Sequence, residues 1–100
     1  MIIGATYRQN LSDPFENNNF GLVTGSASAV NFADRQCQLV RLMAYSTNIG
    51  SFFIGDVSGN CVWELDAGYD TGWFGIDNLN NLWHRSASGT VDRLVYWIQK

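Results

Sequence analysis

Short apolar runs alternate with turn residues along most of the chain. The clearest run is Phe52-Phe53-Ile54, which lies between an Asn-x-Gly-Ser sequence at residues 48–51 and the pair Gly55-Asp56. Glycine and asparagine tolerate the positive φ that a sharp reversal needs, whereas phenylalanine and isoleucine pack well on a pleated surface. Similar turn signals recur at residues 58–60, 67–68, 77–81 and 88–90. Short strands with this spacing predict a mostly β chain, folded as a small antiparallel β-sandwich or jelly-roll-like domain.

Alternation within the predicted strands also indicates which residues share a side. Residues 20–24 form the first firm strand and residues 26–30 the next piece, with Gly25 marking a bulge between them. In the later strands, the residues on one side of their own strand are Phe74, Ile76, Leu82, His84, Leu94, Tyr96 and Ile98. The residues on the other side are Trp73, Trp83, Arg85, Val91, Val95 and Trp97. The last strand has two apolar sides, and a subunit interface is a natural cover for the second, so Val95 and Trp97 are predicted to mediate self-association.

Residues 33–45 carry two competing patterns. One interpretation is a helix that begins near Asn31 or Asp34. The other is a strand with apolar residues on both faces, interrupted only by Arg41. Because strands are predicted on either side, we interpret this stretch as a central strand, with one face in the core and the other covered.

Composition and charge limit the class of protein and the partners to be expected. One hundred residues fit a single domain, and the 46% apolar and 14% aromatic content exclude a disordered chain. Only 15% of the residues are charged, which favours a surface that is partly hidden in an assembly. The net charge is −3 and the six Lys and Arg residues are scattered, so no nucleic-acid partner is expected. No apolar run has membrane-spanning length and residues 1–6 are unlike a secretion signal, so we expect no membrane partner and synthesis in a cytosol.

Residues 1–19 differ from residues 20–100. After Ile2-Ile3 the segment is polar, rich in asparagine, and contains the only proline. A segment of this kind buries too little apolar area to fold alone. It is either a surface loop or frayed terminus, or an extended arm that orders on a neighbouring subunit, for example by adding a strand to a sheet edge. We therefore divide the chain into an extended N-terminal arm, 1–19, and a β-sandwich domain, 20–100.

Residues with catalytic or metal-binding chemistry are few. His84 is the only histidine, and no nucleophile signature lies near it, so we interpret it as a partly exposed residue of a sheet and predict no enzyme activity. The aspartates in or near turns are Asp56, Asp66, Asp70 and Asp77. Turn aspartates usually bond their own backbone, and the loop spacing of a calcium site is missing. Cys37 and Cys61 are compatible with one disulfide, but we favour two reduced, buried thiols. The sequence therefore predicts neither a cofactor nor a metal site.

The tryptophans suggest a second possibility. Trp73 and Trp83 lie opposite the apolar sides of their strands, and exposed aromatic rings beside Asn and Asp can bind sugars by stacking and hydrogen bonding. The other interpretation places these rings in the core or in a subunit interface, and the spread of aromatics over several strands favours it.

The order of motifs resembles that of small virion proteins of tailed bacteriophages, most of all capsid decoration (cement) proteins. The matching features are an Asn-x-Gly-x-x-x-x-Gly-Asp strand at 48–56, a Leu-x-x-Gly turn at 65–68, a Leu-x-x-Leu segment at 79–82, a Gly-containing turn at 88–90 and a closing strand. The resemblance covers roughly the last two-thirds of the chain, and its motifs are structural turns, not chemistry.

The resemblance implies a structural role on the exterior of a virion assembled in the host cytoplasm. The partner would be the major capsid protein, and the chain would form a homo-oligomer, with a trimer as the first expectation. The arm residues expected to contact the shell are Ile2, Ile3, Tyr7, Leu11 and Phe15. The alternative is a glycan- or receptor-binding module of a phage head fibre or tail, which would use Trp73 and Trp83.

Overall fold

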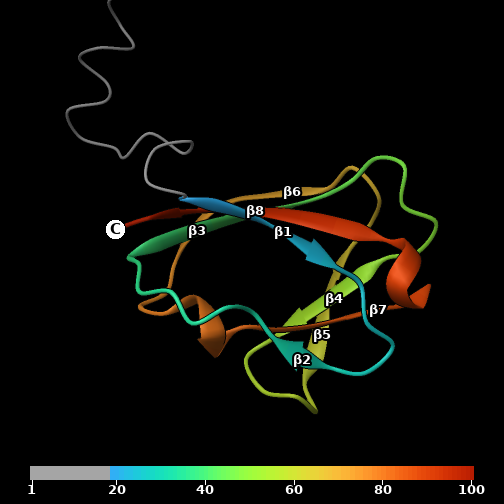
Figure 1. Ribbon diagram of the computed structural model, residues 1–100, viewed down its shortest axis with the longest axis horizontal. Helices are drawn as coiled ribbons and strands as arrows, with labels where there is room; N and C mark the ends of the chain where they lie inside the picture. The colour runs from blue at the N-terminus through green and yellow to red at the C-terminus, as the bar shows by residue number, and fades with distance from the viewer. Residues whose placement is uncertain (1–18) are drawn as a thin grey trace, which may run out of the picture.

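The computed structural model describes residues 19–100, which form two packed layers of antiparallel strands (Figure 1). The strands are β1 (Phe20–Thr24), β2 (Val30–Asn31), β3 (Leu39–Ala44), β4 (Phe52–Gly55), β5 (Cys61–Leu65), β6 (Asp70–Gly75), β7 (Trp83–Ser86) and β8 (Arg93–Gln99). Two short 3-10 helices, η2 (Leu79–Asn81) and η3 (Gly89–Val91), precede β7 and β8. The predicted mostly β fold is confirmed.

The strand order is that of a jelly roll. Sheet A has the order β1-β8-β3-β6, and sheet B has the order β2-β7-β4-β5. Every connection except the β4–β5 hairpin passes from one sheet to the other, as Figure 1 shows. Eight strands connected in this way form the double Greek key of jelly rolls, an architecture found in viral capsid proteins and lectins. The prediction of a small antiparallel, jelly-roll-like sandwich is therefore confirmed.

The hydrophobic core lies between the sheets and takes one side of each strand. On β3, Val40, Leu42 and Ala44 are fully buried, and β3 pairs with both β8 and β6. The central-strand interpretation of this stretch is confirmed, and the helix is wrong. The other core residues are Phe32, Cys37, Phe52, Ile54, Leu65, Leu79, Leu82, Leu94, Tyr96 and Ile98. Each large apolar side chain buried here contributes about 1.5–3 kcal/mol to the free energy of unfolding.

The prediction of a strand over residues 26–30 is wrong. Strand β2 spans only Val30–Asn31, and the Ser28 amide donates to Ser26 Oγ in a bend before it. Gly25 is also not a bulge residue: a Cβ at this position would lie 2.2 Å from the carbonyl oxygen of Gly89. The reason for glycine is therefore close backbone contact, at the point where the chain leaves sheet A for sheet B.

A buried carboxylate fixes the connection between β3 and β4. Asp92 is 0% exposed and accepts hydrogen bonds from the amides of Ile49 (2.8 Å) and Gly50 (2.9 Å) and from Ser86 Oγ (3.2 Å). Beside it, the Asn48 side chain accepts from the Arg93 amide and donates to the Arg93 carbonyl, both at 2.8 Å. The Asn-x-Gly sequence at 48–50 is thus held against the start of β8, and through Ser86 against sheet B.

Candidate functional site

The outward side of sheet A carries aromatic and aliphatic residues across all four strands. Strand pairing aligns Phe20 of β1 with Trp97 of β8, Trp97 with Arg41 of β3, and Arg41 with Trp73 of β6. A neighbouring row contains Leu22, Val95, Met43 and Asp70 in the same strand order. We call this surface the A face, defined as Phe20, Leu22, Leu39, Arg41, Met43, Asp70, Trp73, Val95 and Trp97.

The A face is open to solvent, although it is mostly apolar. Leu22 is 54% exposed, Phe20 and Trp73 are each 39% exposed, and the remaining members are half-buried. Contiguous exposed apolar surface of this kind marks an interaction site more often than scattered single residues do. The sequence predicted that the outer side of the central strand, now β3, is covered. Within residues 19–100 this side is covered only in part, because its residues Leu39, Arg41 and Met43 are half-buried.

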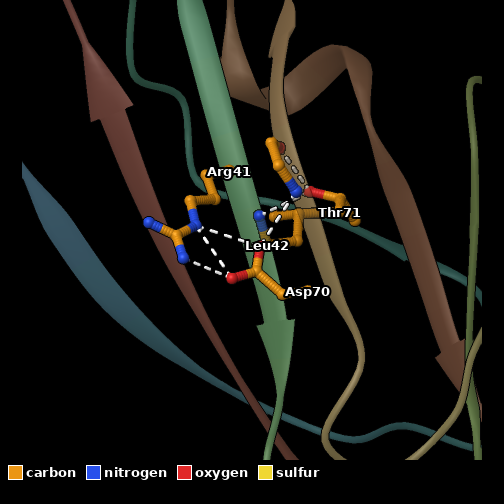
Figure 2. Close-up of polar contacts among 5 residues, drawn as sticks. Arg41, Leu42, Asp70 and Thr71 are labelled. Atoms are coloured by element: carbon orange, nitrogen blue, oxygen red, sulfur yellow. Dashed lines mark hydrogen bonds and ion pairs between the residues drawn. The ribbon is translucent and has the colours of Figure 1, made fainter.

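The only charges on the A face neutralise each other. Arg41 Nε donates to both oxygens of Asp70, at 2.9 and 3.1 Å, and its Nη2 forms an ion pair with the same carboxylate (Figure 2). The Arg41 guanidinium also lies 5.2 Å from the ring centroid of Trp97, within the range of a cation–π contact. Hydrogen bonding to Arg41 lowers the pKa of Asp70 below its usual value. Among the nine residues of the A face both charges are thus paired, and the exposed Arg93 lies on the same side of β8 at the start of the strand.

A bulge in β6 directs Asp70 toward Arg41. The register of β3 and β6 shifts between Arg41 and Met43, and Gly72 adopts a φ of +70°. The Gly72 amide donates to Asp70 Oδ1 at 2.9 Å, and Thr71 Oγ1 accepts from the Leu42 amide at 3.0 Å (Figure 2). Bulges commonly re-aim a side chain in this way.

The structure brings Trp73 onto the same face as Val95 and Trp97, whereas it separates Trp73 from Trp83. Val95 and Trp97, predicted to mediate self-association, lie beside each other on β8, and Trp73 lies two strands from Trp97. Trp83 belongs to β7 of sheet B, where it pairs with Asn31 and Gly55. Trp73 and Trp83 therefore lie in different sheets and do not form a common platform. Phe20 and Leu22 were not predicted as site residues, although their alternation with Gly21 and Val23 is visible in the sequence.

His84 is a core residue, so its interpretation as a partly exposed sheet residue is wrong. It is 3% exposed, and its ring lies 4.8 Å from that of Phe32 and 5.9 Å from that of Phe52. Its Nδ1 has no hydrogen-bond partner among the described atoms. Burial lowers the pKa of His84 to about 4, because the charged form loses its hydration. The imidazole is therefore neutral near pH 7.

The two cysteines are free and buried, as predicted. Burial raises the pKa of both the Cys37 and the Cys61 thiol, so both stay protonated near neutral pH. In the part of the chain that the structure describes, no three His, Cys, Asp or Glu side chains lie together in a group able to hold a metal ion. Residues 19–100 also contain no helix that is long and apolar enough to cross a membrane.

A polar hollow of about 700 Å³ lies at one end of the sandwich. Its lining consists of Asp34, Arg35, Gln36, Cys37, Gln38, Asn78 and Lys100. Asn19, the first residue that the structure describes, lies near the same end, because its carbonyl accepts from the Ile98 amide at 2.8 Å, two residues before Lys100. The arm residues predicted to contact a shell, Ile2, Ile3, Tyr7, Leu11 and Phe15, lie outside the described residues.

Comparisons of this chain with protein-family models, with curated proteins and with solved structures found no match.

Proposed function

We propose that this protein is a structural virion protein that decorates a bacteriophage capsid and stabilises it by bridging major capsid proteins. The observation that carries the proposal is the A face, a mostly apolar surface that reaches all four strands of sheet A and whose two charged residues, Arg41 and Asp70, are paired with each other. The jelly-roll architecture agrees with this role, because viral capsid proteins use it, although a fold alone does not define a function. The motif order that resembles decoration proteins gives independent support.

In this proposal, the A faces of neighbouring copies pack around a symmetry axis, with Val95 and Trp97 near the centre of each contact. Strand spacing gives the A face a flat area of roughly 300 Å², well below the roughly 800 Å² per partner of a standard interface. Each contact is therefore weak, and several copies held on one lattice add their contacts through multivalency. The arm residues, among them Tyr7 and Phe15, supply the contacts to the shell, and the first oligomer to test is a trimer.

The test combines the native mass of the purified chain with its binding to undecorated capsid shells. Sedimentation equilibrium over a range of concentrations should show reversible association toward a trimer, as weak contacts require, and Trp97→Ala should weaken self-association and shell binding by about 10- to 100-fold, the range for a buried aromatic anchor. Trp83→Ala is the matched control, because Trp83 is also half-buried on an outward side but belongs to sheet B. Equal effects of the two variants, or a monomer that does not bind shells, would contradict the proposal.

A further inference from the structure

A small hollow opens between the edge strands of the two sheets, away from the A face. Strand β5 ends sheet B and β6 ends sheet A, so each has one edge without a neighbouring strand in its sheet. The hollow measures about 270 Å³ and is lined by Ile54, Gly55, Asp56, Asn60, Val62, Trp63, Phe74 and Leu82. We propose that it binds one neutral pyranose ring, an activity separate from capsid decoration.

The aromatic part of the hollow is a corner made by two rings. Trp63 and Phe74 lie 5.3 Å apart between ring centroids, with their planes at 64° to each other. Trp63 is 39% exposed although its strand position directs it toward the core, because β5 has no further strand beside it. Ile54 and Leu82 form the buried floor behind the rings. An indole exposed in a concave site offers a stacking surface to the C–H face of a sugar.

The polar part of the hollow comes from the loop between β4 and β5. Asn60 Nδ2 donates to Asp56 Oδ1 at 3.4 Å, a long contact, and Asp56 makes no other hydrogen bond or ion pair within residues 19–100. One carboxylate oxygen thus stays available to accept from a sugar hydroxyl, and the Asn60 amide can both donate and accept. Donors and acceptors beside an aromatic wall match a pyranose, which has an apolar face and a rim of hydroxyls.

The size and the charge of the hollow limit the class of ligand that it can bind. Binding sites for drug-sized molecules are usually about 300 to 1,000 Å³, so a hollow of 270 Å³ suits a single ring better than an oligosaccharide. The exposed Asp56 carboxylate disfavours anionic sugars. An extended peptide added to the edge of β5 is the competing occupant, and it would bond to backbone groups instead of the Asp56 side chain.

The experiment is a titration of the ¹⁵N-labelled full chain with the methyl pyranosides of glucose, galactose, mannose and N-acetylglucosamine, with sialic acid as the anionic control. We expect at least one neutral sugar to shift the Trp63 indole N–H and the Asn60 side-chain amide. Titration to about 50 mM saturates a site with a millimolar dissociation constant.

Three variants define the site. Asp56→Asn lies on an exposed loop and should weaken sugar binding by about tenfold or more, since a charge-assisted hydrogen bond is lost. Trp63→Phe keeps an aromatic cover over the core and should weaken binding through the smaller ring. Trp97→Ala should leave sugar binding unchanged, which separates this site from the proposed decoration function. The inference is overturned if no neutral pyranoside produces shifts, if Asp56→Asn binds as tightly as the original chain, or if only extended peptides perturb β5.

Discussion

The outer side of sheet A is apolar across all four strands, whereas on sheet B the apolar residues Val62 and Trp83 alternate with the charged residues Glu64 and Arg85. Sheet A displays Leu22, Trp73 and other apolar residues, and its one ion pair is internal to the face. On sheet B, Glu64, Phe53 and Arg85 pair across three strands, and the Arg85 guanidinium covers the Phe53 ring at 4.3 Å. Both sheets bury their inner sides in the same core, so folding does not demand an apolar outer side. The more continuous apolar outer side is the one that the proposed self-association would cover.

The inner sides of the two sheets differ in the polar residues that they bury. Sheet A contributes apolar side chains such as Leu42, Leu94 and Ile98 to the core, whereas sheet B also contributes the buried polar residues His84 and Ser86. Buried polar groups are costly unless they are hydrogen-bonded. Ser86 is bonded to Asp92, but His84 Nδ1 is not bonded among the described atoms. Sheet B should therefore be the more sensitive to changes inside the core, and sheet A to changes on its surface.

The largest effect is expected where the two sheets are joined, at Asp92. Asp92→Ala removes three hydrogen bonds and leaves the amides of Ile49 and Gly50 without their acceptor. Because an unpaired buried group and a lost charged acceptor both cost free energy, we expect a loss of about 3 to 5 kcal/mol in the free energy of unfolding. Urea unfolding at pH 7 measures it. A loss below about 1 kcal/mol would show that the carboxylate does not hold the β3–β4 connection.

The next largest effect is a loss of stability at low pH, caused by His84 on the inner side of sheet B. The pKa of His84 falls from an ordinary 6.5 to about 4 in the folded chain, so the proton binds the unfolded state more tightly. Stability is fully present above pH 6.5 and is lost as the pH falls toward 4, by up to about 3 kcal/mol. Urea midpoints measured between pH 7 and pH 4 test this. His84→Leu should remove that part of the slope, and an unchanged slope would mean that other groups cause it.

His84 also shows how far the sequence could predict the structure. Alternation placed it correctly on the side of Leu82, and the same rule gave the buried side of β8, because a period of two is a local property of strands. Its burial depends on Phe32 and Phe52, which come from other strands and loops, and a single sequence does not reveal that pairing. The short β2 was missed because residues 26–28 bond locally and backbone contacts at Gly25 end the first strand.

The candidate site was predictable in part for the same reason. Val95 and Trp97 were found because one strand with two apolar sides is visible in the sequence. Their grouping with Phe20 and Trp73 depends on the strand order β1-β8-β3-β6, which is set by long-range pairing. The ion pair of Arg41 with Asp70 also needs the β6 bulge, and the sequence gives no sign of it beyond Gly72.

A smaller effect should come from charges placed on the two outer sides. Leu22→Lys adds a charge to the A face, at an edge-strand position that is 54% exposed, and should weaken self-association by about tenfold, since the charge is desolvated at the contact. Val62→Lys is the matched control, because Val62 is 73% exposed on β5, an edge strand of sheet B. Both variants should unfold at nearly the same urea concentration as the original chain. Sedimentation equilibrium distinguishes them, and equal masses would mean that the A face is not the contact.

The smallest effect is expected from the ion pair within the A face. Asp70→Asn leaves the Arg41 charge uncompensated, but both groups are about one-third exposed, so solvent screening limits the loss of unfolding free energy to about 0.5–1 kcal/mol. The lowered pKa of Asp70 means that the stability it contributes is present above the unfolded pKa and is lost as the pH falls through the folded value. Glu64→Gln removes an exposed charge from sheet B and should change neither stability nor self-association. If Asp70→Asn weakens self-association more than it weakens folding, the pair serves the contact, because an unpaired guanidinium is costly only where a partner excludes water.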